Sequence, residues 1–308
     1  MSQRIASMIA ASTEIVCALG FERDLIARSH ECDFPESVRR LPVVTETKFD
    51  PDGTSYQIDE RVKAILQEGL SVYRVMGEKL RALGPDVIIT QIQCEVCAVS
   101  RKDVEEAVYG WMGNRPRIVS LNPNSLADVW EDIRSVARAL GAPERGDALV
   151  AKLRARIERE REKGASRGRV PTVACIEWID PLMAAGNWVP ELVELAGGQN
   201  LFGEGGKHSP WMRWEDVVKR DPDVIIVMPC GWDIERSSQE MPTLEKSPGW
   251  TSLTAVRQGN VVLVDGNQYF NRPGPRVVES LEITREILDR WANPSLFSSR
   301  GTGWKAWP

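Results

Sequence analysis

Four of the six cysteines stand in segments that follow expected strands, where their thiolates would be accessible for soft-ligand chemistry: Cys32, Cys94, Cys97 and Cys230. Four thiolates at one site are the donor set of tetrahedral zinc or of an iron–sulfur cluster. Two other interpretations stay open, namely uncoordinated thiols that line a ligand pocket and cysteines that serve only in packing. Cys17 and Cys175 stand within apolar stretches and are expected to be small buried side chains.

One of only two histidines lies beside a cysteine and two acids, in the segment 29–33 (SHECD). His30 is therefore a candidate metal ligand, or a side chain that is only hydrogen-bonded to a neighbouring acid. Trp178 and Trp232 come directly after expected strands, where an indole ring favours stacking on a flat ligand. The spacing yields no Ser-His-acid or paired-carboxylate pattern. A binding protein is thus favoured over an enzyme.

Two stretches of similar sequence predict how these residues are positioned. Residues 78–89 (EKLRALGPDVII) and 215–226 (EDVVKRDPDVII) share the glutamate-to-proline spacing and the sequence PDVII. Each predicts the end of a surface helix, a Pro-Asp turn and a buried strand. Cys94 and Cys230 follow these strands, and ligands of open α/β sheets bind beyond the carboxyl ends of strands. A repeat at long separation indicates two lobes built on one plan.

The remaining pattern predicts two Rossmann-like α/β lobes joined by a single long rigid helix. Strands are expected at 5–9, 24–28, 86–90, 117–121, 172–177 and 261–264, and helices at 58–68, 73–83, 102–111, 125–140 and 189–196. An Arg/Glu-rich helix without glycine from 147 to 163 suits a stiff connector. The predicted organisation is an N-terminal lobe at 1–142, the connecting helix at 143–166, a C-terminal lobe at 167–292 and a tail at 293–308.

The first strand leads into Ala11-Ser12-Thr13-Glu14 and then an apolar helix. Backbone N–H groups at such a turn can meet an anionic or carbonyl ligand, so Ser12 and Thr13 are candidate ligand residues. The alternative is an ordinary helix cap.

Composition excludes some classes of protein. The net charge of −5 argues against nucleic-acid binding, and no apolar run of about 20 residues predicts a membrane span. The N-terminus lacks the pattern of a secretory signal. These features predict a cytoplasmic protein, or a periplasmic one if a leader was removed.

The order of these motifs resembles that of the class III periplasmic-type substrate-binding proteins, in particular the cobalamin-binding family of ABC importers. The resemblance covers nearly the whole chain, from Ile5 to Trp291. It depends on the Ala11–Glu14 turn, the two Pro-Asp strands, the central helix, the segment 195–202 (LAGGQNLF) and the segment 269–276 (YFNRPGPR).

The resemblance implies a corrinoid held in a cleft between two lobes, against aromatic and polar loop residues. Carried over by position, the implied contacts are His30, Trp178, Trp211, Tyr269, Phe270, Asn271 and Arg272. His30 then gains a further possible role as an axial ligand to cobalt. Glu31, Cys32, Cys94, Cys97, Cys230 and Trp232 are candidates for the same cleft from their places in the loops.

The resemblance also implies docking to an ABC permease through one glutamate on each lobe, at Glu78 and Glu215. The helix dipole alone favours an acid at these positions. The cysteines are not part of the ordinary corrinoid-binding pattern. Two functions therefore stay open: a protein that binds a corrinoid or related metal chelate, and a cytosolic metalloprotein with a cysteine-ligated zinc or iron–sulfur site.

Overall fold

The computed structural model describes residues 3–68, 70–92, 101–108, 116–165, 168–296 and 298–308. The chain forms two compact units. Unit 1 comprises Met1–Gly53, Gln57–Pro123 and Ala127–Lys152, and unit 2 comprises Thr54–Tyr56, Asn124–Leu126 and Leu153–Pro308. The boundary falls inside one continuous helix, α6 (Pro143–Ala165), which matches the connecting helix predicted at 143–166 within one residue.

Unit 1 is built on a parallel sheet with the strand order β2-β1-β5-β6. Ile5 of β1 and Ile88 and Ile89 of β5 are fully buried, as expected of central strands covered on both faces. A separate antiparallel pair, β3-β4, completes the strands of the described part. The elements that lie wholly or mostly in this unit are β1 (Ile5–Ser7), α1 (Ala10–Ala18), η1 (Glu22–Asp24), β2 (Leu25–Arg28), η2 (Glu36–Arg40), β3 (Thr45–Thr47), α2 (Ser55–Gln67), β4 (Tyr73–Val75), α3 (Gly77–Leu83), β5 (Val87–Gln91), α4 (Arg101–Val108), β6 (Arg117–Leu121) and α5 (Leu126–Ala139).

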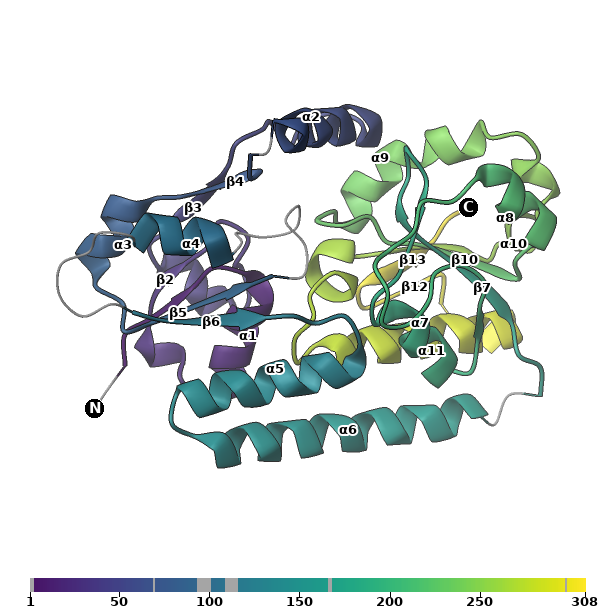
Figure 1. Ribbon diagram of the computed structural model, residues 1–308. Helices are drawn as coiled ribbons and strands as arrows, with labels where there is room; N and C mark the ends of the chain where they lie inside the picture. Colours follow the sequence, from purple (N-terminus) through teal and green to yellow (C-terminus); the bar gives the residue numbers. More distant parts are fainter. Residues whose placement is uncertain (1–2, 69, 93–100, 109–115, 166–167, 297) are drawn as a thin grey trace. The chain divides into compact units, whose positions relative to one another are not determined.

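Unit 2 has a mixed sheet with the order β12-β13-β11-β10-β7-β8, and β9 pairs with β7 beside it. The central strands β7, β10 and β11 are parallel. In Figure 1, α7 and α11 cover one face of this sheet and α8, α9 and α10 lie over the other. Its elements are β7 (Thr172–Trp178), β8 (Met183–Ala184), α7 (Val189–Leu195), β9 (Gln199–Asn200), α8 (Trp214–Arg220), β10 (Val224–Val227), α9 (Ile234–Glu245), η3 (Trp250–Ser252), α10 (Thr254–Arg257), β11 (Val261–Val264), η4 (Gly266–Phe270), α11 (Val277–Ala292), η5 (Pro294–Leu296), β12 (Arg300–Gly301) and β13 (Trp304–Ala306).

The repeated stretch folds in the same way in both units, which confirms the prediction. Helix α3 ends at Gly84 in the left-handed conformation, and α8 ends at Asp221 in the same conformation. Asp221 is not glycine, and its carboxylate accepts hydrogen bonds from the backbone N–H and the hydroxyl of Thr254 at 2.7 Å each. These bonds offset the cost of the left-handed conformation and help to lower the pKa of Asp221.

The aspartate of each Pro-Asp turn binds the start of the neighbouring strand. Asp86 accepts the N–H of Arg4 at 2.9 Å, immediately before β1. Asp223 accepts the N–H of Thr172 at 2.9 Å, where β7 begins, and its second oxygen accepts Arg169 at 2.7 Å. The aspartate thus joins the strand that follows it, β5 or β10, to the start of the neighbouring strand, β1 or β7.

We expect Asp223→Ala to lower the free energy of unfolding by about 1–3 kcal/mol, because it leaves the half-buried N–H of Thr172 without its acceptor. Asp86→Ala is the matched control and should cost less, since Asp86 is exposed and water can replace its carboxylate. Urea unfolding of the three proteins measures the difference. Equal losses in the two variants would contradict the argument.

The turn expected at Ala11–Glu14 lies inside α1, which begins directly after Ile9 and has no side-chain cap. Two further predicted segments differ in the structure. The helix expected at 73–83 begins only at Gly77, because residues 73–75 form β4 and pair with β3. The tail at 293–308, predicted without regular structure, forms the hairpin β12-β13 and joins the sheet through β11. In both cases pairing with a strand distant in sequence decides the conformation. The local pattern of apolar residues does not indicate that pairing.

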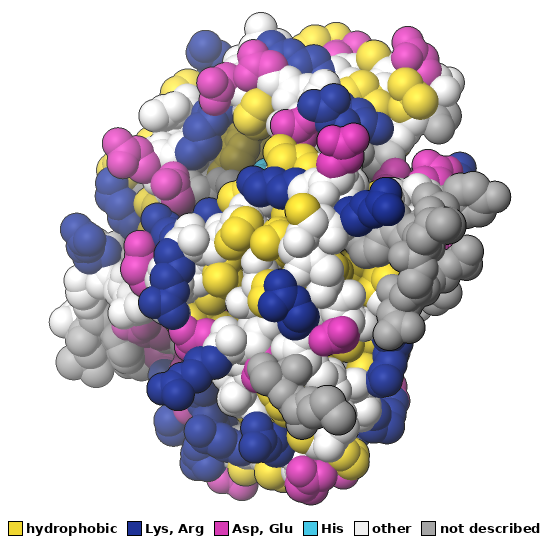
Figure 2. All heavy atoms as spheres, turned by 90° about the vertical axis from the view of Figure 1, so that its left-hand side faces the viewer, with side chains coloured by type: hydrophobic (Ala, Val, Ile, Leu, Met, Phe, Trp, Pro, Cys, Tyr) yellow, Lys and Arg dark blue, Asp and Glu magenta, His cyan; other side chains and the backbone are white. Residues whose placement is uncertain are grey.

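No helix in the described part of the chain is both long and apolar enough to cross a membrane. Figure 2 shows Lys and Arg side chains interspersed with Asp and Glu over the face that it presents, with hydrophobic side chains between them. That face carries no extended area of a single charge, in keeping with the net charge of −5.

Candidate ligand-binding surface

The carboxyl ends of β7, β10 and β11 meet at one edge of the sheet in unit 2, because these three strands are parallel. Trp178 is the last residue of β7, the segment 229–233 follows β10, and η4 follows β11. Cys230 donates its backbone N–H to the carbonyl of Glu177 at 3.2 Å, which joins two of these ends. The fold therefore gathers Trp178, Cys230 and Trp232 at the kind of edge where open α/β sheets bind ligands.

Two tryptophan rings and an arginine, Trp178, Trp232 and Arg236, are in contact at this edge and are called the aromatic stack below. The rings of Trp178 and Trp232 lie 5.0 Å apart between centroids, tilted by 49°. The guanidinium carbon of Arg236 lies 3.9 Å from the centroid of the Trp232 ring, within the range of a cation–π interaction. The indole Nε1 of Trp178 is buried and has no hydrogen-bond partner among the described residues. The stack thus combines an apolar face with a free N–H donor.

Asp233 positions Arg236 at the start of α9. Its side chain caps the helix by accepting the backbone N–H of Arg236 at 2.8 Å. The arginine stands four residues after Trp232, which is one helical turn. Sequence reasoning missed Arg236, although this spacing beside an Asp cap was a usable signal.

Trp211 is the most exposed aromatic side chain in the described part of unit 2, at 58%. It is held by an isolated antiparallel bridge to Met183 of β8, and the neighbouring Met212 donates its N–H to the carbonyl of Leu182 at 3.0 Å. Its backbone is thus fixed while its ring faces solvent. A fixed exposed indole is the type of group that binds flat ligands.

The η4 segment brings polar groups to the same edge. Arg272 is buried, and its guanidinium donates to the side-chain oxygen of Asn267 at 3.0 Å. The side-chain amide of Asn271 donates to the carbonyl of Met228 at 3.1 Å. Phe270 is buried. Burial raises the pKa of Asp265, against the hydrogen bond from the backbone N–H of Gln268, and the charge of Asp233 raises it further.

In unit 1, His30 follows the carboxyl end of β2. Its Nδ1 lies 2.8 Å from the hydroxyl of Thr45, and its ring lies 5.4 Å from that of Tyr73. The Nε2 atom is buried without a hydrogen-bond partner, and the nearest oxygen of Glu31 is 4.0 Å away. Burial lowers the pKa of His30, Arg28 lowers it further and Glu46 opposes the shift, so the site favours the neutral imidazole.

Tyr73 completes this group, because its hydroxyl donates to Glu31 at 3.3 Å. Sequence reasoning missed it by placing it in a helix. A neutral imidazole is the form that binds a metal, but Nε2 is covered and would first have to be exposed.

Ser12, Thr13 and Cys32 are fully buried and bonded to one another or to close neighbours. The hydroxyl of Thr13 donates to the sulfur of Cys32 at 3.0 Å, and the oxygens of Ser12 and Ser7 lie 2.6 Å apart. Burial raises the pKa of the Cys32 thiol, although hydrogen bonds to Ser29 and Thr13 oppose the shift. This network packs the start of α1 against the β2 loop. The ligand role predicted for these residues stays a prediction.

Comparisons with known proteins show the family of this chain. A family model described as periplasmic binding protein matches residues 5–267, which is most of the chain. The chain belongs to the periplasmic binding protein family. A vitamin B12-binding protein of Vibrio campbellii is 26% identical over 281 residues, covering 91% of this chain and 87% of its own. An ABC transporter substrate-binding lipoprotein of Bacillus subtilis is 21% identical over 295 residues, covering 93% and 80%.

Among solved structures, a periplasmic heme-binding protein of Roseiflexus in its apo form superposes with a TM-score of 0.68 at 24% identity. It covers 94% of this chain and 100% of its own. At that identity the likeness concerns the fold alone. It confirms the α/β class of this family member.

The four-cysteine site finds no support in the described part of this binding protein. There, no three His, Cys, Asp or Glu side chains come together to hold a metal ion. Cys32 and Cys230 are free, and Cys94 and Cys97 lie outside the described residues. Cys175 is buried, as predicted, whereas Cys17 is only partly buried. Burial raises the pKa of both thiols to about 12.

The two glutamates predicted to dock a permease occupy equivalent places in this family member. Glu78 is in the first turn of α3 and Glu215 in the first turn of α8, and both are exposed. Their docking role stays a prediction.

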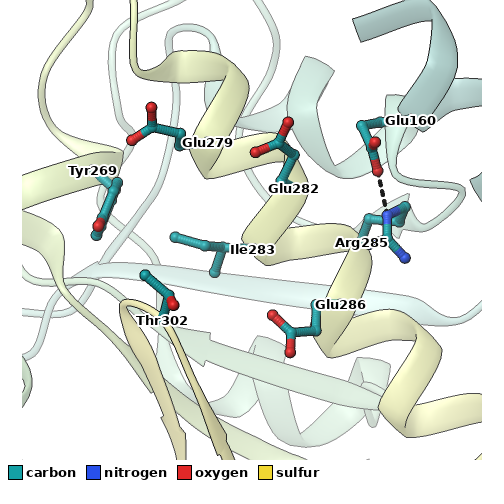
Figure 3. A pocket seen from close by; sticks show the side chains of 8 residues that line it. All are labelled: Glu160, Tyr269, Glu279, Glu282, Ile283, Arg285, Glu286 and Thr302. Atoms are coloured by element: carbon teal, nitrogen blue, oxygen red, sulfur yellow. Dashed lines mark hydrogen bonds and ion pairs between the residues drawn. The ribbon is translucent and has the colours of Figure 1, made fainter. Parts of the chain in front are cut away.

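A pocket of about 400 Å³ is lined by residues of α6, η4, α11 and the β12-β13 turn. Figure 3 shows its lining residues, Glu160, Tyr269, Glu279, Glu282, Ile283, Arg285, Glu286 and Thr302. Its acids are engaged within the protein: Glu282 accepts Arg156 at 2.8 Å, and Glu286 accepts the indole N–H of Trp304 at 3.0 Å. Glu160 pairs with Lys163 at 2.7 Å and with Arg285. We therefore interpret the pocket as part of the helix packing.

Proposed function

We propose that this protein binds a flat metal-chelate macrocycle, either a corrinoid or a heme, with a corrinoid as the first candidate. The observation that carries the proposal is the stack of Trp178, Trp232 and Arg236 at the carboxyl edge of unit 2. An indole face favours stacking on a broad planar ligand, and the buried N–H of Trp178, which has no partner among the described residues, would donate to a peripheral carbonyl or carboxylate once it is exposed.

The relatives support the same class of ligand. One is named for vitamin B12 and a solved structure of the same fold is named for heme, and both ligands are metal chelates of a flat ring. The proposed contacts in unit 2 are Trp178, Trp211, Trp232 and the segment 269–272. In unit 1 the proposed contacts are His30 and Glu31. Cys230, half-buried between two of the strand ends, would line the same surface.

The relatives also support delivery to an ABC permease from outside the cytoplasm. One is named as an ABC transporter substrate-binding lipoprotein, and the family itself is named for the periplasm. We therefore propose export in place of the cytoplasmic location expected from the sequence. Glu78 and Glu215 are the proposed permease contacts, since each presents an exposed carboxylate from an equivalent helix.

Titration calorimetry with cyanocobalamin, cobinamide and hemin tests the ligand class. We expect at least one to bind with Kd below about 1 μM, equivalent to about 8 kcal/mol. A shift of its visible absorption bands should accompany binding. Tighter binding of the corrinoids selects them, and tighter binding of hemin selects heme. No binding of any of the three at about 100 μM would overturn the proposal.

A further inference from the structure

The C-terminal hairpin joins the sheet of unit 2 and lies beyond the residues matched by the family model. Strand β13 pairs antiparallel with β11, and β12 pairs with β13. Trp304 is 1% exposed, and its indole N–H donates to Glu286 on α11 at 3.0 Å. The hairpin is therefore fastened to both the sheet and a helix.

The turn of this hairpin is in tight contact with η4. Gly303 has a φ of +73°, and a Cβ built there would lie 2.6 Å from the Tyr269 ring and 3.0 Å from Ile283. The carbonyl of Gly303 accepts the backbone N–H of Asp265 at 2.9 Å, just before η4 begins. Figure 3 shows Tyr269, Ile283 and Thr302 on the same side of the pocket. Only glycine fits between the ring and the turn.

The start of η4 is in equally close contact with the segment that carries the aromatic stack. A Cβ on Gly266 would lie 2.2 Å from the carbonyl oxygen of Pro229. Asn267 donates its N–H to the carbonyl of Trp232 at 3.0 Å. The segment η4 thus contacts both the hairpin and the Pro229–Trp232 segment.

We propose that the C-terminal hairpin positions the ligand-binding surface, with Gly303 acting through Tyr269 and η4 on the segment that carries Trp232. The inference rests on the proposed function for its effect on affinity, but the contact chain itself is independent of any ligand. Gly303 is a positioning residue in this scheme and touches no ligand. A larger residue there displaces Tyr269, and the displacement loosens η4 where it meets Trp232.

Hydrogen exchange of the ligand-free full chain tests the first step. In Gly303→Ala the amides of Asp265, Tyr269 and Asn271 should exchange at least about tenfold faster, because their bonds hold η4 together. The amide of Met228, which donates to β7 at 2.8 Å, reports on the integrity of the sheet and should stay protected. Unchanged exchange at Asp265, Tyr269 and Asn271 would overturn the proposal.

Gly259→Ala is the matched control. Gly259 also has a positive φ, of +66°, in the same unit, but a Cβ there meets no atom within 4 Å. Gly259→Ala also places alanine at a positive φ, but it makes no contact like that of residue 303 with Tyr269. Hydrogen exchange in η4 should therefore not change. If both variants raise amide exchange in η4 equally, backbone strain alone explains the effect of Gly303→Ala and the proposal is overturned.

A double-mutant cycle with Tyr269→Ala tests the second step. Gly303→Ala alone should weaken binding of the macrocycle about tenfold, and it should have little further effect once the Tyr269 ring is removed. The double variant also supplies a folded protein if the single one fails to fold. Additive effects would show that Gly303 does not act through Tyr269. If the wild-type chain binds neither corrinoid nor heme, the proposed function fails, while the exchange experiment still decides the role of the hairpin.

Discussion

Trp178→Leu should weaken binding of the macrocycle about thirtyfold, equivalent to about 2 kcal/mol, while the fold persists. The loss has two sources. The ring face proposed to stack on the ligand disappears together with the tilted contact to Trp232, and so does the buried indole N–H that has no partner in the described protein. Leucine keeps position 178 apolar. The substitution therefore tests the contribution of the aromatic ring and not that of apolar packing in general. Calorimetry with the ligand identified above measures the change in Kd.

The matched control is Trp214→Leu. Trp214 also stacks on a second tryptophan, Trp250, with centroids 5.9 Å apart, and its indole N–H donates to the carbonyl of Pro248 at 2.8 Å. This pair belongs to α8 and η3 rather than to the strand ends, so its loss should leave ligand affinity within about twofold of wild type. Equal losses of affinity in the two variants would show that Trp178 acts only through folding.

A large pH-dependent effect on stability should come from Asp132 in α5 of unit 1. This carboxylate is 8% exposed and accepts the N–H of Asn122, where β6 ends. Burial raises its pKa from 3.8 to about 7, the hydrogen bond from Asn122 opposes the shift, and the charges of Asp128 and Glu131 add to it. Because the folded pKa lies above the unfolded value, protonation stabilises the fold. This contribution is complete below pH 3.8 and is lost as the pH rises to about 7.

Asp132→Asn keeps the shape and the acceptor but carries no charge. Its stability relative to wild type should therefore rise by about 2 kcal/mol between pH 5 and pH 8. Calorimetric unfolding of the full chain across this range measures the difference. Asp147→Asn, which removes an exposed partner of Arg134 in the same unit, should keep the wild-type profile because Asp132 is untouched. A parallel profile for Asp132→Asn would contradict the assignment.

Much of the fold follows from local signals. The repeated Pro-Asp stretch predicted two equivalent helix-turn-strand units, and both form with the same left-handed cap and the same aspartate acceptor. The strands at 117–121 and 261–264 have the predicted bounds, because continuous apolar runs between breakers mark buried parallel strands. The placement of Trp178 and Trp232 at one edge followed from strand ends alone.

Other features depend on partners distant in sequence. Tyr73 lies in β4 because β3 pairs with it, and this pairing brings it to His30 and Glu31. Thr13 meets Cys32 through the packing of α1 on the β2 loop, and its hydroxyl is buried there. Arg236 contacts Trp232 only because α9 places its guanidinium over the ring.

The sequence by itself determined the α/β class, the long helix and the strand ends where a ligand is expected, since periodicity and turn chemistry act over a few residues. Only the tertiary structure decided what the C-terminal tail does. Gly301 and Gly303 look like ordinary turn glycines in sequence, yet each leaves no room for a side chain beside Trp304 or Tyr269. The contact between Gly303 and Tyr269 joins elements that are distant in sequence, so no local pattern encodes it.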